Sequence, residues 1–98
     1  MQWDAAKMTG FDWDAGNQKK SLDKHAVTCD EAEQVFVNAP LKVLFDSAHS
    51  DAEPRFHAFG RTNDGRHLTV AFTVRGHLIR IISARAMHRK ERNYYEKA

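Results

Sequence analysis

Apolar and polar residues alternate through residues 68–85, LTVAFTVRGHLIRIISAR. This period of two is interrupted at Arg75-Gly76, so the sequence predicts two strands joined there by a two-residue turn. The residues that would face each other on the apolar side are Val74 and His77, Phe72 and Ile79, Val70 and Ile81, and Leu68 and Ser83. The other side would carry Arg80 in mid-strand, with Thr69, Ala71, Thr73, Leu78, Ile82 and Ala84. One face can therefore form a core, while the other holds a charge that a purely structural sheet rarely contains.

Residues 55–61, RFHAFGR, predict a strand that precedes this pair. Asn63-Asp64-Gly65 is typical of a three-residue hairpin turn, because glycine adopts the left-handed conformation that such a turn requires. The hairpin would add Phe56, Ala58 and Gly60 to the apolar face. The opposite, open face would gain Arg55, His57, Phe59 and Arg61, beside His67, Thr69 and Arg80. A slip of one residue would invert this assignment.

Helical signals flank the predicted strands. Asp14 is a suitable N-cap for a helix that extends to about Lys24, and Thr28 with Glu31 fits a capping box for a second helix. Asn38-Ala39-Pro40 ends that helix, since proline cannot continue it. From about Ala86 the period becomes helical again, in AMHRKERNYYEKA.

These elements predict an α+β fold with a three- to four-stranded antiparallel sheet, two N-terminal helices and a C-terminal helix. Residues 11–98 are expected to form one domain, with short strands near 11–13 and 41–45 and a long polar loop at 46–54. Residues 1–10 are expected to be an extension that is frayed or adds a small edge strand.

Charge is divided unevenly along the 98 residues. Residues 1–54 contain five Lys or Arg against ten Asp or Glu, a balance of −5, and residues 55–98 contain ten against three, a balance of +7, which together give the net +2. This asymmetry favours an acidic or phosphate-bearing partner for the C-terminal half, although a solvated surface would look the same.

The bulk properties narrow the protein class. The single cysteine, Cys29, excludes an internal disulfide and a cysteine-based zinc site. No apolar run reaches the roughly 18 residues that span a bilayer, and residues 1–10 lack the pattern of a secretory signal. We therefore expect a cytoplasmic protein without membrane contact.

The open face carries the candidate chemistry. Arginine suits phosphate because its planar fork donates two parallel hydrogen bonds, Phe59 could stack on a base, and imidazoles carry protons near neutral pH. Together these groups could cleave RNA without a metal or other cofactor. The alternative is that these side chains only keep the sheet soluble. Histidines on separate strands lack the spacing of metal ligands, and no glycine-rich loop is present to hold a phosphate.

Several sequence blocks together resemble the BrnT family of type II toxins, from about Phe11 to the C-terminus. The likeness is carried by Lys24-His25, by Gly60-Arg61 and Gly65-Arg66, by the run from Arg80 to Arg85 (RIISAR), and by Glu91-Arg92 with Tyr95. One departure is Ala26, where the family usually has glycine, which suggests that the linker there tolerates change.

The resemblance implies a RelE-like ribonuclease fold and a toxin that arrests growth by cleaving RNA. It also implies a BrnA-like ribbon-helix-helix antitoxin, through which the complex, expected to contain two copies of each chain, binds operator DNA. The catalytic set carried onto this chain is Arg80 and Arg85 with Lys24 and His25 nearby, and His67 or His25 would carry protons. The residues expected to bind RNA are Arg55, His57, Phe59, Arg61 and Arg66.

Two functions of different classes follow from the sequence. One is a metal-independent endoribonuclease toxin neutralised by its antitoxin. The other is a non-catalytic module that binds RNA or the antitoxin.

Overall fold

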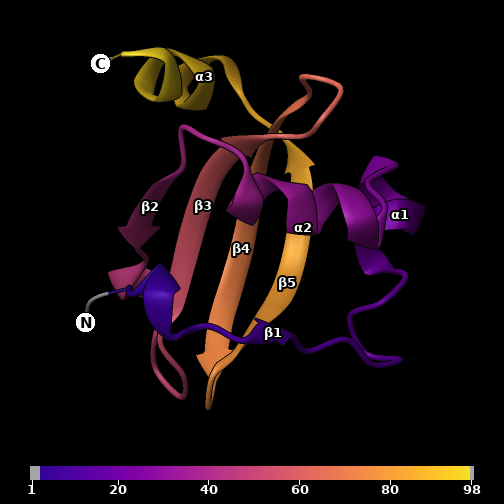
Figure 1. Ribbon diagram of the computed structural model, residues 1–98, viewed down its shortest axis with the longest axis vertical. Helices are drawn as coiled ribbons and strands as arrows, with labels where there is room; N and C mark the ends of the chain where they lie inside the picture. Colours follow the sequence, from indigo (N-terminus) through magenta and orange to yellow (C-terminus); the bar gives the residue numbers. More distant parts are fainter. Residues whose placement is uncertain (1–2, 98) are drawn as a thin grey trace.

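The computed structural model describes residues 3–97 and contains a five-stranded mixed sheet with the strand order β1-β5-β4-β3-β2 (Figure 1). The strands are β1 (Gly10–Phe11), β2 (Lys42–Phe45), β3 (Arg55–Arg61), β4 (His67–Arg75) and β5 (Leu78–Ala86). The helices are α1 (Lys20–His25), α2 (Cys29–Val37) and α3 (Arg89–Glu96), with short 3-10 turns at Ala5–Lys7 and Ser47–His49. The α+β class is confirmed. The predicted all-antiparallel sheet is wrong, because β1 pairs in parallel with β5.

The hairpin of β3 and β4 has the predicted register. Phe56 lies opposite Phe72, Ala58 opposite Val70 and Gly60 opposite Leu68. The loop spans residues 63–65, since the backbone N–H of Thr62 donates to the Arg66 carbonyl at 2.9 Å. Gly65 has a φ of +85°, in the left-handed region that the turn was predicted to need.

The hairpin of β4 and β5 turns one residue later than predicted. Arg75 pairs with Leu78, so Gly76 and His77 form the two-residue turn, and Gly76 has a φ of +62°. This shifts the pairing by two residues, which leaves the faces of Phe72, Val74, Ile79 and Ile81 unchanged. The apolar side of this part of the hairpin is therefore as expected.

A register shift then alters the second half of β5. Phe72 lies opposite Ile81, but Ala71, the residue before Phe72 in β4, lies opposite Ser83. Ile82 is therefore the extra residue of a β-bulge. Beyond the bulge the faces are inverted: Ala84 is buried in the core and Ser83 lies on the open face, the reverse of the prediction. Periodicity alone does not reveal an inserted residue.

The core lies between the sheet and α2, which crosses the sheet in Figure 1. The Thr28–Glu31 capping box forms as predicted, and Ala32 and Val35 of α2 are buried. The helix approaches so closely that a Cβ on Gly60 would lie 2.8 Å from Cγ1 of Val35. The buried residues of the sheet include Phe56, Ala58, Leu68, Val70, Phe72, Ile79, Ile81 and Ala84.

The N-terminal segment is more ordered than the sequence predicted. Trp3 packs on the core and contacts the rings of Phe36 and Phe72 edge to face, with centroids 6.1 and 5.0 Å away. The described part of the extension is therefore part of the packing, while residues 1–2 of the predicted extension lie outside the described residues.

The segment before α1, residues 12–17, runs along the edge of β5 that faces away from β4. Asp14 does not cap a helix directly: its Oδ1 accepts from the Gly16 N–H at 2.8 Å, and α1 begins six residues later at Lys20. Asn17 is buried and donates to the carbonyls of Asp12 and Ile81, at 3.0 and 2.8 Å. These bonds satisfy edge carbonyls and fix the loop beside β5.

Candidate functional site

The open face of the sheet, on the side opposite α2, presents side chains in rows across the strands. Arg55, Thr73 and Arg80 form one row, and His57, Ala71 and Ser83 form the next. Phe59, Thr69 and Arg85 form the third row. Rows are about 7 Å apart and neighbouring strands about 4.8 Å. The structure thus brings Arg55, His57, Arg80 and Arg85 onto one face, as expected for all but Arg85, which the sequence did not assign to a face.

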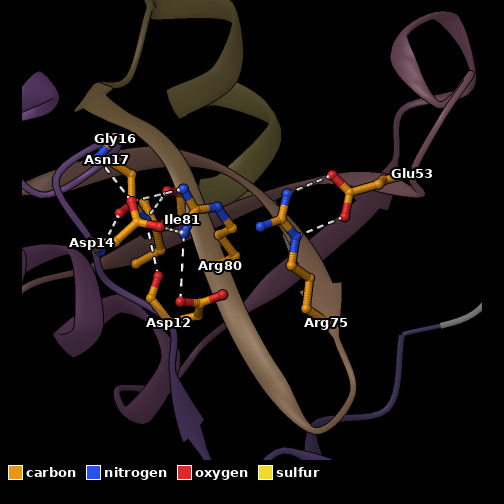
Figure 2. A network of polar contacts seen from close by, with 8 residues as sticks. All are labelled: Asp12, Asp14, Gly16, Asn17, Glu53, Arg75, Arg80 and Ile81. Atoms are coloured by element: carbon orange, nitrogen blue, oxygen red, sulfur yellow. Dashed lines mark hydrogen bonds and ion pairs between the residues drawn. The ribbon is translucent and has the colours of Figure 1, made fainter.

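Arg80 is held by carboxylates of the N-terminal loop (Figure 2). Its two terminal nitrogens donate to the two oxygens of Asp14, both at 3.0 Å, and Nη1 lies 3.5 Å from Asp12. The Arg80 side chain is 14% exposed and that of Asp14 is 57% exposed. The hydrogen bond from Arg80 lowers the pKa of Asp14. Arg80 is therefore not the unpaired cation that the sequence suggested.

A second pair flanks Arg80 on the same face. Arg75 donates from Nε and Nη2 to the two oxygens of Glu53, at 2.8 and 3.0 Å, as Figure 2 shows. The hydrogen bond from Arg75 lowers the pKa of Glu53, and so does the charge of Arg80. Arg80 and Arg75 thus lie side by side at this end of the face, with Asp12 and Asp14 on one side of them and Glu53 on the other.

Arg85 is clamped to α3. Its guanidinium donates to both oxygens of Glu91, at 2.7 and 2.9 Å, and Glu91 also accepts from Thr69 Oγ1 and from the His88 backbone N–H. Burial would raise the pKa of Glu91, but the hydrogen bonds from Arg85, His88 and Thr69 outweigh it and lower the pKa to about 2. This cluster attaches α3 to the sheet.

Two of the predicted site residues lie beneath α3. Phe59 is buried and meets the ring of Tyr94 edge to face, with centroids 5.5 Å apart. His67 meets the ring of Tyr95 in the same way at 5.6 Å, and its Nε2 lies 3.9 Å from Glu96. With α3 in place, Phe59 does not offer a ring face to a base.

Lys24 and His25 lie apart from these rows, at the exposed C-terminal end of α1. Arg66 joins them to the β3–β4 hairpin, because its Nη1 donates to the Ala26 carbonyl and to Glu31, both at 2.9 Å. Arg61 is exposed, donates to the Ala39 carbonyl at 3.0 Å and lines a hollow of about 380 Å³ with Asn38 and Asn63. The structure therefore does not bring Lys24, His25, Arg61 or Arg66 into contact with Arg80.

His57 has a partner that the sequence did not suggest. Its Nε2 lies 2.9 Å from Oδ2 of Asp46, and Nδ1 of His49 lies 2.9 Å from the same oxygen. The hydrogen bond from His57 is the main cause of a lowered pKa at Asp46. Asp46 follows β2 and His57 lies in mid-strand of β3, which pairs with β2. The signal that could have found the pair was the presence of predicted strands at 41–45 and 55–61, had they been paired with each other.

The charge asymmetry of the sequence is largely resolved within the fold. Acidic residues of the N-terminal half pair with basic residues of the C-terminal half: Asp14 with Arg80, Glu53 with Arg75, Glu31 with Arg66, and Asp46 with His57. Among residues 3–97, Arg55 and Arg61 have no carboxylate within ion-pair distance. The imbalance therefore reflects pairing between the halves as well as the capacity to bind a partner.

Two further features concern cofactors and membranes. In the part of the chain that the structure describes, no three His, Cys, Asp or Glu side chains are grouped so as to hold a metal ion. None of the helices within residues 3–97 has the length and apolar character needed to cross a bilayer.

The fold and the open face define a small α+β protein whose cationic sheet face is partly neutralised by its own carboxylates. The family described as "Ribonuclease toxin, BrnT, of type II toxin-antitoxin system" matches residues 13–91. The chain belongs to this family, so it is the toxin of a type II toxin-antitoxin pair, a class with an antitoxin partner and an RNA substrate. The resemblance found in the sequence is confirmed.

Among solved structures, the chain is similar to the ribonuclease toxin BrnT of Brucella abortus, with 23% identity and a TM-score of 0.63. The match covers 84% of this chain and 100% of the Brucella chain. At this identity the likeness supports the shared fold. No curated protein matches the chain in a sequence comparison.

Proposed function

We propose that this toxin is an endoribonuclease that cleaves RNA without a metal ion and thereby arrests growth. Family membership supports ribonuclease activity in general. The observation that carries the proposal is the convergence of Arg55, His57 and Arg80 in adjacent rows of the open face. Arginine forks there can bind a phosphodiester, and an imidazole in the next row is close enough to exchange protons with it.

The reaction is an attack of the ribose 2′-hydroxyl on the adjacent phosphorus. A base removes the hydroxyl proton, cations stabilise the charge that develops on the phosphorane, and an acid protonates the departing 5′-oxygen. Arg80 is proposed as the stabilising cation, with Arg55, Arg61 and Arg66 binding the RNA backbone. The sequence proposed Arg85 for the same role, but its two hydrogen bonds to Glu91 favour a structural one. The sequence proposed His67 or His25 as proton carriers, with Lys24 nearby. Alanine variants of these two histidines serve as alternatives to His57 in the experiments.

Access to Arg80 requires an exchange of partners. Asp14 is a mostly exposed loop carboxylate whose charge water screens, so an RNA phosphate can replace it on Arg80. Arg55 needs no such exchange, since it has no carboxylate partner among residues 3–97. RNA would therefore meet Arg55 first and Arg80 second.

Cleavage assays separate this function from its alternative. Purified full-length toxin in EDTA should convert RNA into fragments that end in 2′,3′-cyclic phosphates. A gel shift with intact RNA would instead favour the non-catalytic binding module, a reading that the internal pairing of Arg80 and Arg85 supports. Cleavage that EDTA abolishes would overturn the metal-independent mechanism.

We also propose that the antitoxin is a BrnA-like ribbon-helix-helix protein and that the resting complex contains two copies of each chain. Family membership supports an antitoxin in general. Operator DNA would be bound through the antitoxin. Co-expression followed by light scattering tests the stoichiometry, and a complex of any other mass would contradict it.

A further inference from the structure

We propose that Asp46, His49 and His57 form the proton-transfer centre of the toxin, with Asp46 positioning both imidazoles. This inference rests on the proposed ribonuclease function and assigns a chemical step of it to particular residues. The observation behind it is a single carboxylate oxygen, Oδ2 of Asp46, that lies 2.9 Å from both Nδ1 of His49 and Nε2 of His57.

Asp46 is held in place through its backbone N–H and through its Oδ1. Its backbone N–H donates to the Arg55 carbonyl at 2.8 Å, which anchors it to the start of β3. Its Oδ1 accepts from the Ala48 N–H at 3.2 Å, which caps the short 3-10 turn and leaves Oδ2 for the histidines. The Asp46 side chain is 11% exposed, and both of its oxygens accept hydrogen bonds. Such a support is what a catalytic histidine needs to keep one orientation.

The ionised carboxylate defines which nitrogen of each ring carries a hydrogen. Hydrogen bonding from His57 lowers the pKa of Asp46, so near neutral pH the carboxylate can only accept. The proton of a neutral His57 therefore lies on Nε2 and that of a neutral His49 on Nδ1. Each ring then has one nitrogen left over, Nδ1 of His57 and Nε2 of His49, to take or give a proton.

The surroundings of this centre suit a phosphodiester. His49 lines a hollow of about 260 Å³ together with Arg55, Thr73 and Ile82. Arg55 is two residues from His57 on the same face of β3 and has no carboxylate partner among residues 3–97. The residues beside His57 on β4 and β5 are Ala71 and Ser83. Their side chains are short, so they do not cover the imidazole ring.

Other charged groups near the centre come from three elements. Asp51 and Glu53 of the loop line the same hollow as His49, and Glu53 is bound by Arg75 of β4. Arg80 of β5 lies in the adjacent row. The neighbour of His57 on β2 is Leu44, which is uncharged. The hollow beside His49 is therefore lined by one cation, Arg55, and by two carboxylates, Asp51 and Glu53, of which Glu53 is neutralised by Arg75.

The proposed step balances in protons and bonds. The free nitrogen of one neutral imidazole takes the proton of the 2′-hydroxyl while that oxygen bonds to phosphorus. The bond from phosphorus to the 5′-oxygen then breaks, and this oxygen takes a proton from the other ring, which starts as imidazolium. The products are a 2′,3′-cyclic phosphate and a 5′-hydroxyl, and exchange with water restores both rings.

The test compares full-length variants by cleavage rate across pH 5 to 9 in EDTA. His49→Ala and His57→Ala should each lose about 100-fold or more in rate, the usual effect of removing a general acid or base, while RNA still binds. Each histidine variant should also lose the pH dependence on one side of the bell-shaped plot of cleavage rate against pH. His77→Ala, at the exposed β4–β5 turn, is the matched control and should cleave at the original rate.

Asp46→Asn and added imidazole distinguish positioning from a purely structural role. An amide holds an imidazolium less well than a carboxylate does, so the optimum of Asp46→Asn should move to lower pH. Free imidazole should restore cleavage to His57→Ala and leave Arg55→Ala unchanged. His57→Gln, which can still donate to Asp46, should keep the fold and remain inactive.

The outcomes separate this inference from the function on which it rests. If the parent toxin cleaves RNA and the His49 and His57 variants match it in rate and pH profile, the inference is overturned and the function stands. The inference is also overturned if His67→Ala or His25→Ala, rather than the His49 and His57 variants, loses the pH dependence of the cleavage rate. If the parent toxin cleaves no RNA at any pH, both are overturned.

Discussion

Arg80 and Arg85 lie on one strand and one face, and each donates two hydrogen bonds to a single carboxylate at 2.7–3.0 Å. Their carboxylates differ. Asp14 belongs to an exposed loop, whereas Glu91 is 21% exposed, belongs to α3 and accepts further bonds from Thr69 and His88. The same pairing geometry can therefore serve two purposes: a partner that RNA can replace at Arg80, and a permanent attachment of α3 at Arg85.

The energetics support this distinction. An exposed pair contributes about 0–1 kcal/mol, because water competes for both charges. Breaking a pair that is buried and hydrogen-bonded costs several times more, since the remaining charge loses both its partner and its water. Arg80 is the better candidate to act on RNA, and Arg85 the better candidate to hold the fold.

The largest expected effect is on activity at Arg80. Arg80→Ala should lower RNA cleavage by about 100-fold or more and abolish growth arrest, because a cation that stabilises the transition state is removed. Circular dichroism and antitoxin binding should be unchanged, since the main partner that Arg80 loses, Asp14, belongs to an exposed loop. A variant that remains fully toxic would show that Arg80 is not part of the site.

The next effect is on stability at Glu91. Glu91→Gln should lower the free energy of unfolding by about 2 kcal/mol, the cost of replacing charged hydrogen bonds by neutral ones. Asp14→Asn is the matched change at the other arginine and should cost less, because Asp14 is mostly exposed and water screens its charge. Urea denaturation measures both. Equal losses would contradict the contrast between the two pairs.

Acid should remove the stability that Glu91 contributes. The pKa of Glu91 is lowered from 4.5 to about 2, so its contribution to stability is fully present above about pH 4.5 and is lost as pH falls through about 2. Urea midpoints of the parent toxin should fall between pH 5 and pH 2, and those of Glu91→Gln should fall less. Identical pH dependence in the two proteins would rule out Glu91 as the responsible group.

The smallest effect is on RNA affinity. Asp14→Asn should tighten RNA binding only a few-fold, since it removes one carboxylate from Arg80 while Asp12 stays 3.5 Å from its Nη1. Asp30→Asn, which removes an exposed acidic charge from α2, is the control for net charge. Fluorescence anisotropy at two salt concentrations measures both, and equal gains would assign the effect to charge alone.

Local signals in the sequence predicted the parts of the fold that depend on neighbouring residues. The Thr28–Glu31 capping box, the strand at 55–61 and the turn at Gly65 all form as expected. The parallel pairing of β1 with β5 was missed. Strand β1 has only two residues, too few to indicate a partner so far along the chain. The pairing of Arg80 with Asp14, 66 residues away along the chain, was missed for the same reason.

Ala26 illustrates a local signal whose meaning needed the structure. It caps α1 with a φ of +54°, in the left-handed region, where glycine is favoured. The sequence interpretation took the departure from glycine to mean a tolerant linker. The backbone shows instead a position with a conformational preference, so Ala26→Gly is expected to be neutral or stabilising by up to about 1 kcal/mol.

Arg80 and Arg85 are five positions apart, an odd number, so an uninterrupted strand would point them in opposite directions. The extra residue at Ile82 turns the second arginine to the same side as the first. A single-residue deletion there would send one guanidinium into the hydrocarbon interior under α2, so the length of this strand, as much as its composition, is under constraint.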